Sequence, residues 1–179
     1  MNYYGPIELA ASIRTVRNNT IVIAEDIPEE SYSYRPTPDS RSVRELLLHI
    51  AAVWQLTYQI QETERRTWIA DFDFPAFLQQ SSVDEKRPLS KSQIISFLRT
   101  EGERLSRWLE KLPESTLAER VQMPGASHTT KSRFELILGA KEHEMHHRGQ
   151  LMVMQRLLSI VPHLTRNRQS AAAASKANL

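Results

Sequence analysis

The 179-residue chain contains no cysteine and only five glycines, and none of its apolar runs approaches the length of a membrane span. The absence of cysteine excludes a disulfide framework, a thiolate nucleophile and a thiolate zinc site. A transmembrane helix needs about 20 consecutive apolar residues, so we do not expect a membrane protein. Scarce glycine favours long helices over a sheet with many tight turns. Any bound metal must be held by histidine or carboxylate, and any reacting thiol must come from outside the chain.

The N-terminal segment also lacks the features of a secretory signal. It begins Met1-Asn2-Tyr3-Tyr4-Gly5, without a basic region followed by an apolar one. The overall composition, 40% hydrophobic and 25% charged residues, is ordinary for a soluble globular protein. We therefore expect a cytoplasmic protein with one folded domain.

The net charge of +2 is too small to indicate a nucleic-acid-binding protein by itself. The charge is unevenly distributed, however, because no acidic residue follows Glu144. The basic residues after that point are Arg148, Arg156, Arg166, Arg168 and Lys176. We interpret this end as a solvated basic tail and consider nucleic-acid binding the less favoured alternative.

Four segments have the apolar spacing of amphipathic helices, which predicts an all-α four-helix bundle with long connections. The first begins at Pro6, a residue favoured in the first helical turn, and runs to about residue 26. Ser42 and Glu45 resemble a capping box for the second, which we expect to reach about residue 70. Ser90 caps the third, at about 91–112, and the fourth runs from 131 or 132 to 160.

The segments between these helices are expected to differ in character. Residues 27–40 contain three prolines and predict an ordered connector in which Tyr32 and Tyr34 cover the edge of the bundle. Residues 71–90 predict a loop or a short helical crossing, and 113–130 a loop or short hairpin. We assign residues 1–162 to the bundle domain and 163–179 to a mobile basic tail, although its alanine run could extend a helix.

The fourth helix contains three of the six histidines within five residues, at 143, 146 and 147. His143 and His147 are four residues apart, so they lie one turn above each other on one face and can chelate a single metal. His49 lies on the inward apolar stripe of the second helix. Bundles build metal sites from such inward-facing residues. We therefore predict that His49, His143 and His147 bind one metal and leave a coordination position open.

The alternative is that each of these histidines is simply a hydrogen-bonded, partly buried side chain. Two neutral imidazoles packed together in an apolar core would need other partners for their ring nitrogens, which favours a shared metal. His146 is rotated about 100° from His147 on the helix and is expected to lie outside the site. We expect His128 and His163 at the surface.

The same residues match the H-E-x-x-H pattern of zinc proteases, in which Glu144 would act as general base. The rest of such a protease is missing. Its third ligand should follow the motif, yet no acidic residue follows Glu144, and Gln150 and Val153 stand where the extended pattern requires glycine and histidine. We therefore reject the protease interpretation.

The sequence resembles the DinB/YfiT-like superfamily of metal-binding four-helix bundles. The resemblance extends over about residues 5–160 and is strongest in the histidine-rich segment. The stretches that carry it are Ile27-Pro28 with Tyr32, Tyr34, Arg35 and Pro36, then Ser42 through Ala51, and His143 through Leu151. The resemblance implies the same three ligands, His49, His143 and His147, a divalent metal that is most often zinc or nickel, and dimers formed through bundle helices.

Characterised members of that superfamily include bacillithiol transferases and mycothiol-dependent maleylpyruvate isomerase. The resemblance therefore implies a metal-dependent transferase that uses a small-molecule thiol, or a related hydrolase. A non-catalytic, stress-related protein with a structural metal is the alternative. From helix proximity alone, we expect Trp54, Tyr58 and Gln150 to line a cleft for the small-molecule substrate.

Overall fold

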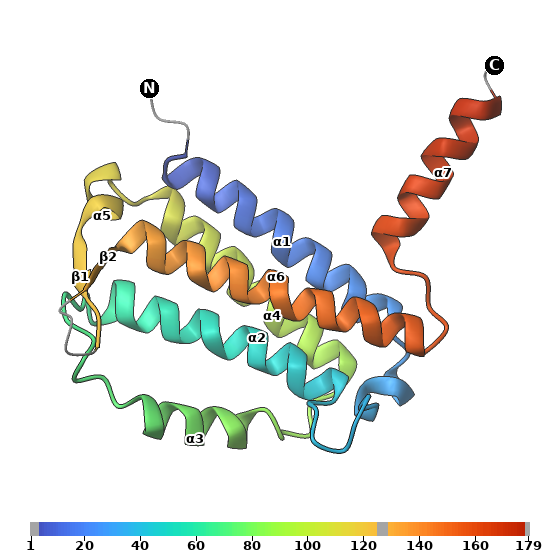
Figure 1. The fold of residues 1–179 in the computed structure, drawn as a ribbon, viewed down its shortest axis with the longest axis horizontal. Coiled ribbons are helices and arrows are strands. Elements are labelled where there is room, and N and C mark those ends of the chain that lie inside the picture. Colours follow the sequence, from blue (N-terminus) through green and yellow to red (C-terminus); the bar gives the residue numbers. More distant parts are fainter. Residues whose placement is uncertain (1–3, 125–128, 178–179) are drawn as a thin grey trace.

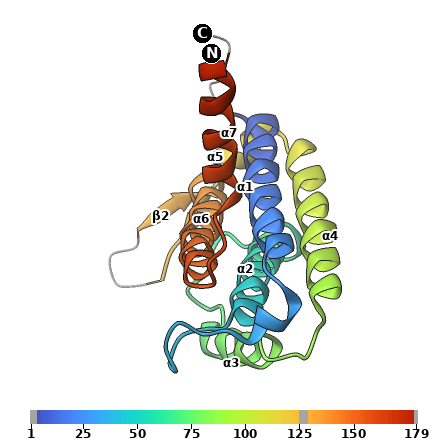
Figure 2. The ribbon, with the colours of Figure 1, turned by 90° about the vertical axis from the view of Figure 1, so that its right-hand side faces the viewer.

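Four long helices form the body of the protein in the computed structural model, which describes residues 4–124 and 129–177. They are α1 (Pro6–Asp26), α2 (Val43–Tyr58), α4 (Lys91–Glu110) and α6 (Arg133–Leu157). Helix α1 packs against α4 and α6, and α2 packs against the same two helices on the opposite side (Figures 1 and 2). The predicted all-α bundle is confirmed.

Serine residues begin three of the four long helices. Ser42, Ser90 and Ser132 each accept a hydrogen bond from the backbone N–H three residues on, and the residue at that position, Glu45, Gln93 or Glu135, bonds back to the serine N–H. Each capping box satisfies two backbone donors that the helix leaves unpaired. These boxes place the starts of the helices where the sequence predicts them.

Helix α2 is shorter than predicted. The α-helix ends at Tyr58, and the chain continues through a π-helical turn at Gln59–Thr63. It then changes direction at Arg65, whose φ is +46°. The chain turns here because Ile69 is buried against Ile60 and Val121, in a small cluster apart from the main core. A straight helix to residue 70 would have carried Ile69 away from these partners.

The main core lies between the four helices. Its largest fully buried side chains come from α1, α2, α4 and the 3-10 turn η1 (Glu29–Ser33), with Ile27 between α1 and η1. They are Trp54, Tyr32, Leu9, Ile13, Ile23, Ile27, Leu46, Leu47, Ile50, Ile94, Leu98 and Leu105. Gly102 allows α1 and α4 to approach closely, because a Cβ atom there would lie 2.6 Å from Cγ of Arg17. No helix in the described ranges is long and apolar enough to cross a membrane.

The connections agree with the sequence expectations. The proline-rich segment forms a 3-10 turn, η1 (Glu29–Ser33), and buries Tyr32, whose hydroxyl donates to the Ala24 carbonyl at 2.8 Å. Helix α3 (Phe74–Asp84) runs beside α2 on the outside of the bundle (Figure 1). A short helix, α5 (Glu114–Ala118), precedes an antiparallel hairpin of β1 (Arg120–Gln122) and β2 (Thr130–Ser132).

The C-terminal segment forms helix α7 (His163–Ala177), which projects away from the bundle (Figures 1 and 2). Residues 167–175 are exposed, as expected for a segment without a core pattern. The predicted surface position of His163 is wrong, because its Nε2 lies 3.0 Å from Asn19 Oδ1 and its side chain is buried. Arg166 adds an ion pair with Asp26 at 2.8 Å. The mobility of the tail and the domain boundary at residue 162 remain predictions.

Candidate metal centre

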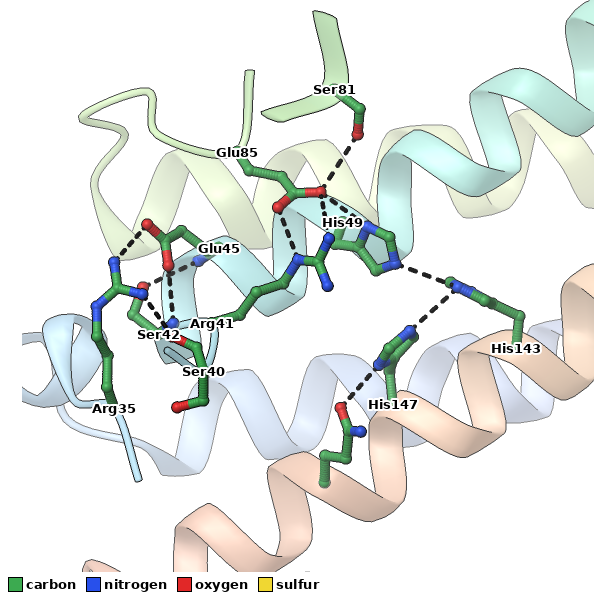
Figure 3. A network of polar contacts seen from close by, with 11 residues as sticks. Arg35, Ser40, Arg41, Ser42, Glu45, His49, Ser81, Glu85, His143 and His147 are labelled. Carbon is green, nitrogen blue, oxygen red and sulfur yellow. Dashed lines mark hydrogen bonds and ion pairs between the residues drawn. The ribbon is translucent and has the colours of Figure 1, made fainter. Parts of the chain in front are cut away.

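The fold brings together the three histidines selected from the sequence. Nε2 of His143 lies 3.2 Å from Nε2 of His49 and 3.1 Å from Nε2 of His147. One ligand atom from each ring lies within 4.8 Å of the others. Figure 3 shows the rings of His143 and His147 on α6 turned toward His49 on α2. Helix α2 therefore supplies one imidazole nitrogen, and the antiparallel helix α6 supplies two, to the same point.

The outer nitrogen of two of these rings is held by an oxygen acceptor. Nδ1 of His49 lies 2.7 Å from Glu85 Oε1, and Nδ1 of His147 lies 2.8 Å from Gln150 Oε1. An ionised carboxylate can only accept, and an amide oxygen also accepts, so both rings carry their proton on Nδ1. Their Nε2 atoms are left with lone pairs directed at the centre of the cluster.

A bound metal satisfies the three convergent imidazole nitrogens better than hydrogen bonds among them would. His143 Nε2 can donate one proton at most, so it cannot satisfy the lone pairs of both His49 and His147. Tetrahedral ligands at about 2.0–2.1 Å from zinc are roughly 3.3 Å apart, close to the two observed separations. The three imidazole donors and these two separations fit a divalent metal.

Burial favours the neutral form of His143 and His147. Desolvation, followed by the charges of His147 and His49, lowers the pKa of His143 to about 4. Burial also lowers the pKa of His147, against the opposing effect of its bond to Gln150. Burial would raise the pKa of Glu85, but hydrogen bonds from His49 and Arg41 outweigh it and bring that pKa to about 2. Neutral His143 and His147 beside an ionised Glu85 carboxylate are suited to metal binding at neutral pH.

Glu144, the acid of the protease-like pattern, binds donors in the core and not the histidines. Its carboxylate is buried and accepts hydrogen bonds from Arg17 Nε at 3.0 Å, Thr20 Oγ1 at 2.7 Å and Trp54 Nε1 at 2.6 Å. These donors belong to α1 and α2. The carboxylate is therefore fully engaged in the core, in agreement with the rejection of a general-base role.

A cavity of about 690 Å³ opens beside His147. Its lining includes Arg41, Lys86 and Gln150, so one of the three predicted lining residues is correctly placed. Trp54 is only 1% exposed, and its indole donates to Glu144. Tyr58 lines a different pocket, where its ring centroid lies 5.4 Å from that of Trp108. Neither residue lines this cavity, because helical phase turns both away from the histidines.

Two residues at the site were missed by sequence reasoning. Glu85 follows α3 and reaches His49 across 36 positions of sequence, and Arg41 pairs with Glu85 at 2.7 Å. Neither residue stands in a local pattern that predicts a role. His146 lies outside the cluster, as expected; its exposed ring is 3.2 Å from Nε2 of Gln150, the residue whose amide oxygen bonds His147. His128 lies outside the described residues.

Comparisons with known proteins identify relatives of this chain in sequence and in fold. The chain is 27% identical over 140 residues to the uncharacterised protein YjoA of Bacillus subtilis, covering 78% of this chain and 82% of that protein. The crystal structure of YjoA, described as DinB-like, matches with a TM-score of 0.63 at 25% identity, covering 85% and 92% of the two chains.

Two further solved structures share the fold at lower identity. YfiT of Bacillus subtilis, described as a probable metal-dependent hydrolase with an unusual four-helix bundle topology, has a TM-score of 0.67 at 16% identity, with 89% and 91% coverage. The colibactin self-resistance protein ClbS, solved with double-stranded DNA, has a TM-score of 0.64 at 14% identity, with 84% and 95% coverage. The family model of the DinB superfamily matches residues 12–151, a range that contains all three histidines, and the chain belongs to this superfamily.

Proposed function

We propose that the protein is a metal-dependent enzyme in which His49, His143 and His147 bind one divalent metal ion, zinc or nickel. The observation that carries this proposal is the convergence of three Nε2 atoms whose lone pairs have no other common partner. The description of YfiT as a probable metal-dependent hydrolase supports the same class of function.

The reaction we propose is attack on a small-molecule electrophile by a thiol or by water. A divalent metal bound here supplies Lewis acidity, which lowers the pKa of a coordinated thiol or water. The chain contributes no cysteine, so a reacting thiol is a low-molecular-weight co-substrate. Glu85 and Gln150 hold the protons of His49 and His147 on Nδ1, and the cavity beside His147 admits the substrate.

Metal analysis of protein purified without a histidine tag tests the ligand assignment. We expect about one zinc or nickel ion per chain, and a loss of at least tenfold in metal affinity in His49→Ala and His147→Ala, because each removes one of three ligands. His146→Ala is the matched control on the same helix and should retain the metal. Equal, negligible metal in the parent protein and both ligand variants would contradict the proposal.

Turnover assays distinguish an enzyme from a protein with a structural metal. Glutathione, bacillithiol and mycothiol are each supplied with a generic electrophile, and water serves as the nucleophile in a parallel hydrolase screen. We expect metal-dependent turnover with one of these nucleophiles. No turnover by metal-loaded protein would favour the structural role.

DNA is a second candidate ligand, supported by the description of ClbS in complex with double-stranded DNA. The basic residues that follow Glu144 extend onto the projecting helix α7. If this surface binds DNA, affinity should fall steeply with salt and disappear when residues 163–179 are removed. A truncated chain that binds DNA as tightly as the full chain would exclude α7 as the binding element.

We further propose that the enzyme is a cytoplasmic homodimer. Leu157 near the end of α6 is 56% exposed and offers an apolar contact to a second copy. Light scattering should report twice the mass of the chain, 20.6 kDa, and Leu157→Asp should shift the equilibrium toward the monomer.

A further inference from the structure

The cavity beside His147 has cationic hydrogen-bond donors that the protein does not use. It is lined by three cations, Arg35, Arg41 and Lys86, and by three carboxylates. Both terminal nitrogens of Arg35 already donate within the protein, Nη1 to the carbonyl of Ser40 and Nη2 to Glu45. Arg41 Nη1 and the Lys86 ammonium are the terminal cationic groups at the cavity that donate to no residue in the described part of the chain.

Arg41 is the better placed of the two. Its Nε donates to Glu85 Oε2 at 2.7 Å and its Nη2 to Oε1 at 3.3 Å, so one edge of the guanidinium is occupied. Nη1 donates no hydrogen bond within residues 4–124 and 129–177. The side chain is 43% exposed, which leaves this free end open to a molecule in the cavity.

Glu85 fixes Arg41 relative to the metal centre. The same carboxylate oxygen, Oε1, contacts Arg41 Nη2 and lies 2.7 Å from His49 Nδ1 (Figure 3). Ser81 donates a further hydrogen bond to Oε1 at 3.2 Å, so the carboxylate is held on three sides. A cation is thereby positioned at a set distance from the three histidines, on the cavity side of α2.

Glu85 balances the charge of Arg41, but it occupies only one edge of the guanidinium and leaves Nη1 free to donate. Glu85 and Glu45 each have a cation partner within the protein, and Glu45 also caps α2 through the Ser42 N–H. The third carboxylate, Asp39, accepts a hydrogen bond from Thr37. The Lys86 ammonium has no partner in the described part of the chain and places an unpaired positive charge at the rim.

We infer that this cavity binds small organic anions, and that Arg41 determines this specificity by binding a carboxylate or phosphate group of the substrate. This inference rests on the proposed function, since the anionic group anchors the substrate while its reactive end extends to the histidines. Arg41 uses Nη1 and the free side of Nη2, and Lys86 adds a weaker, solvent-screened attraction. A cavity of about 690 Å³ accommodates a molecule larger than the anionic group alone.

Calorimetric titration of zinc-loaded protein with three probes tests the inference. Succinate and glycerol 3-phosphate carry the two kinds of anion, and succinamide is the neutral counterpart of succinate. We expect one or both anions to bind, which identifies the preferred group, and succinamide not to bind. Affinity should fall at least about tenfold in Arg41→Gln and about two- to threefold in Lys86→Gln.

Arg87→Gln is the matched control, because it removes the same charge next to Lys86 but lies outside the cavity lining. It should bind the anions as the parent protein does. Arg41→Lys preserves the positive charge but lacks the planar, two-pronged guanidinium, so it should bind the anions with intermediate affinity. An intermediate affinity would also show that the loss in Arg41→Gln is not a folding defect. Zinc content measured on every variant separates loss of the metal from loss of the anion.

Three results would overturn the inference: no binding of either anion, equal affinity for succinamide, or unchanged anion affinity in Arg41→Gln. The last result would mean that the metal alone holds the anion. If the parent protein binds no zinc, the proposed function fails. The same titrations on metal-free protein then still decide whether Arg41 binds anions.

Discussion

At the scale of single residues, Glu85 connects the metal centre to its surroundings. Its carboxylate fixes the proton of His49 on Nδ1 and orients the ring toward His143. Partners of this kind typically contribute 10- to 100-fold to metal affinity. We therefore expect Glu85→Ala to weaken zinc binding by about that factor in a chelator competition, and Glu85→Gln, which retains an acceptor oxygen, to weaken it less. Asp84→Ala should change nothing; an equal loss there would indicate a general charge effect.

At the scale of helices, the buried Glu144 carboxylate joins α6 to α1 and α2. It accepts from Arg17 and Thr20 of α1 and from Trp54 of α2, at a position about 100° around α6 from His143. Glu144→Gln removes the only carboxylate that pairs with Arg17 in the described structure. A buried charge without its partner typically costs about 3–5 kcal/mol, so we expect the free energy of unfolding in urea to fall by about that amount.

The exposed Glu142 provides the control for that measurement. Glu142→Gln lies on the same helix and should change stability by less than about 0.5 kcal/mol. Replacing both members of the buried pair, as Arg17→Met with Glu144→Leu, should recover most of the lost stability, because neither charge is then buried alone. A Glu144→Gln variant as stable as the parent would show that the network contributes little.

At the scale of the whole molecule, the attachment of α7 should depend on pH. Burial lowers the pKa of His163 below its usual value of about 6.5, with Asp26 opposing and Arg166 adding to the effect. His163 therefore binds a proton less readily when α7 is attached to the bundle than when α7 is detached. The attachment is at full strength above about pH 6.5 and weakens as the pH falls toward the lowered pKa.

Amide hydrogen exchange along the first turn of α7 measures this attachment. Exchange, corrected for its intrinsic pH dependence, should accelerate below about pH 6.5 in the parent protein. His163→Gln can retain a hydrogen bond to Asn19 without titrating, so the pH dependence should disappear. A pH profile that survives this substitution would assign the effect to another group.

The sequence by itself determined those features that depend on residues close together in the chain. The capping boxes at Ser42 and Ser90 act over three residues, and the shared face of His143 and His147 follows from one helical turn. The choice of His49 as their partner was also accessible, because its helix presents it on an apolar stripe. The metal-ligand role of these three residues remains a prediction, although their convergence is a property of the fold.

The tertiary structure alone decided which residues surround the cluster. Glu85, Arg41 and the cavity beside His147 depend on how α3 and the start of α2 lie against α6, and no local pattern encodes contacts across such sequence distances. The same applies to Trp54, whose indole finds its acceptor in Glu144 on another helix. Helical periodicity specifies which face of a helix is buried, whereas packing between helices decides which partner each buried polar group meets.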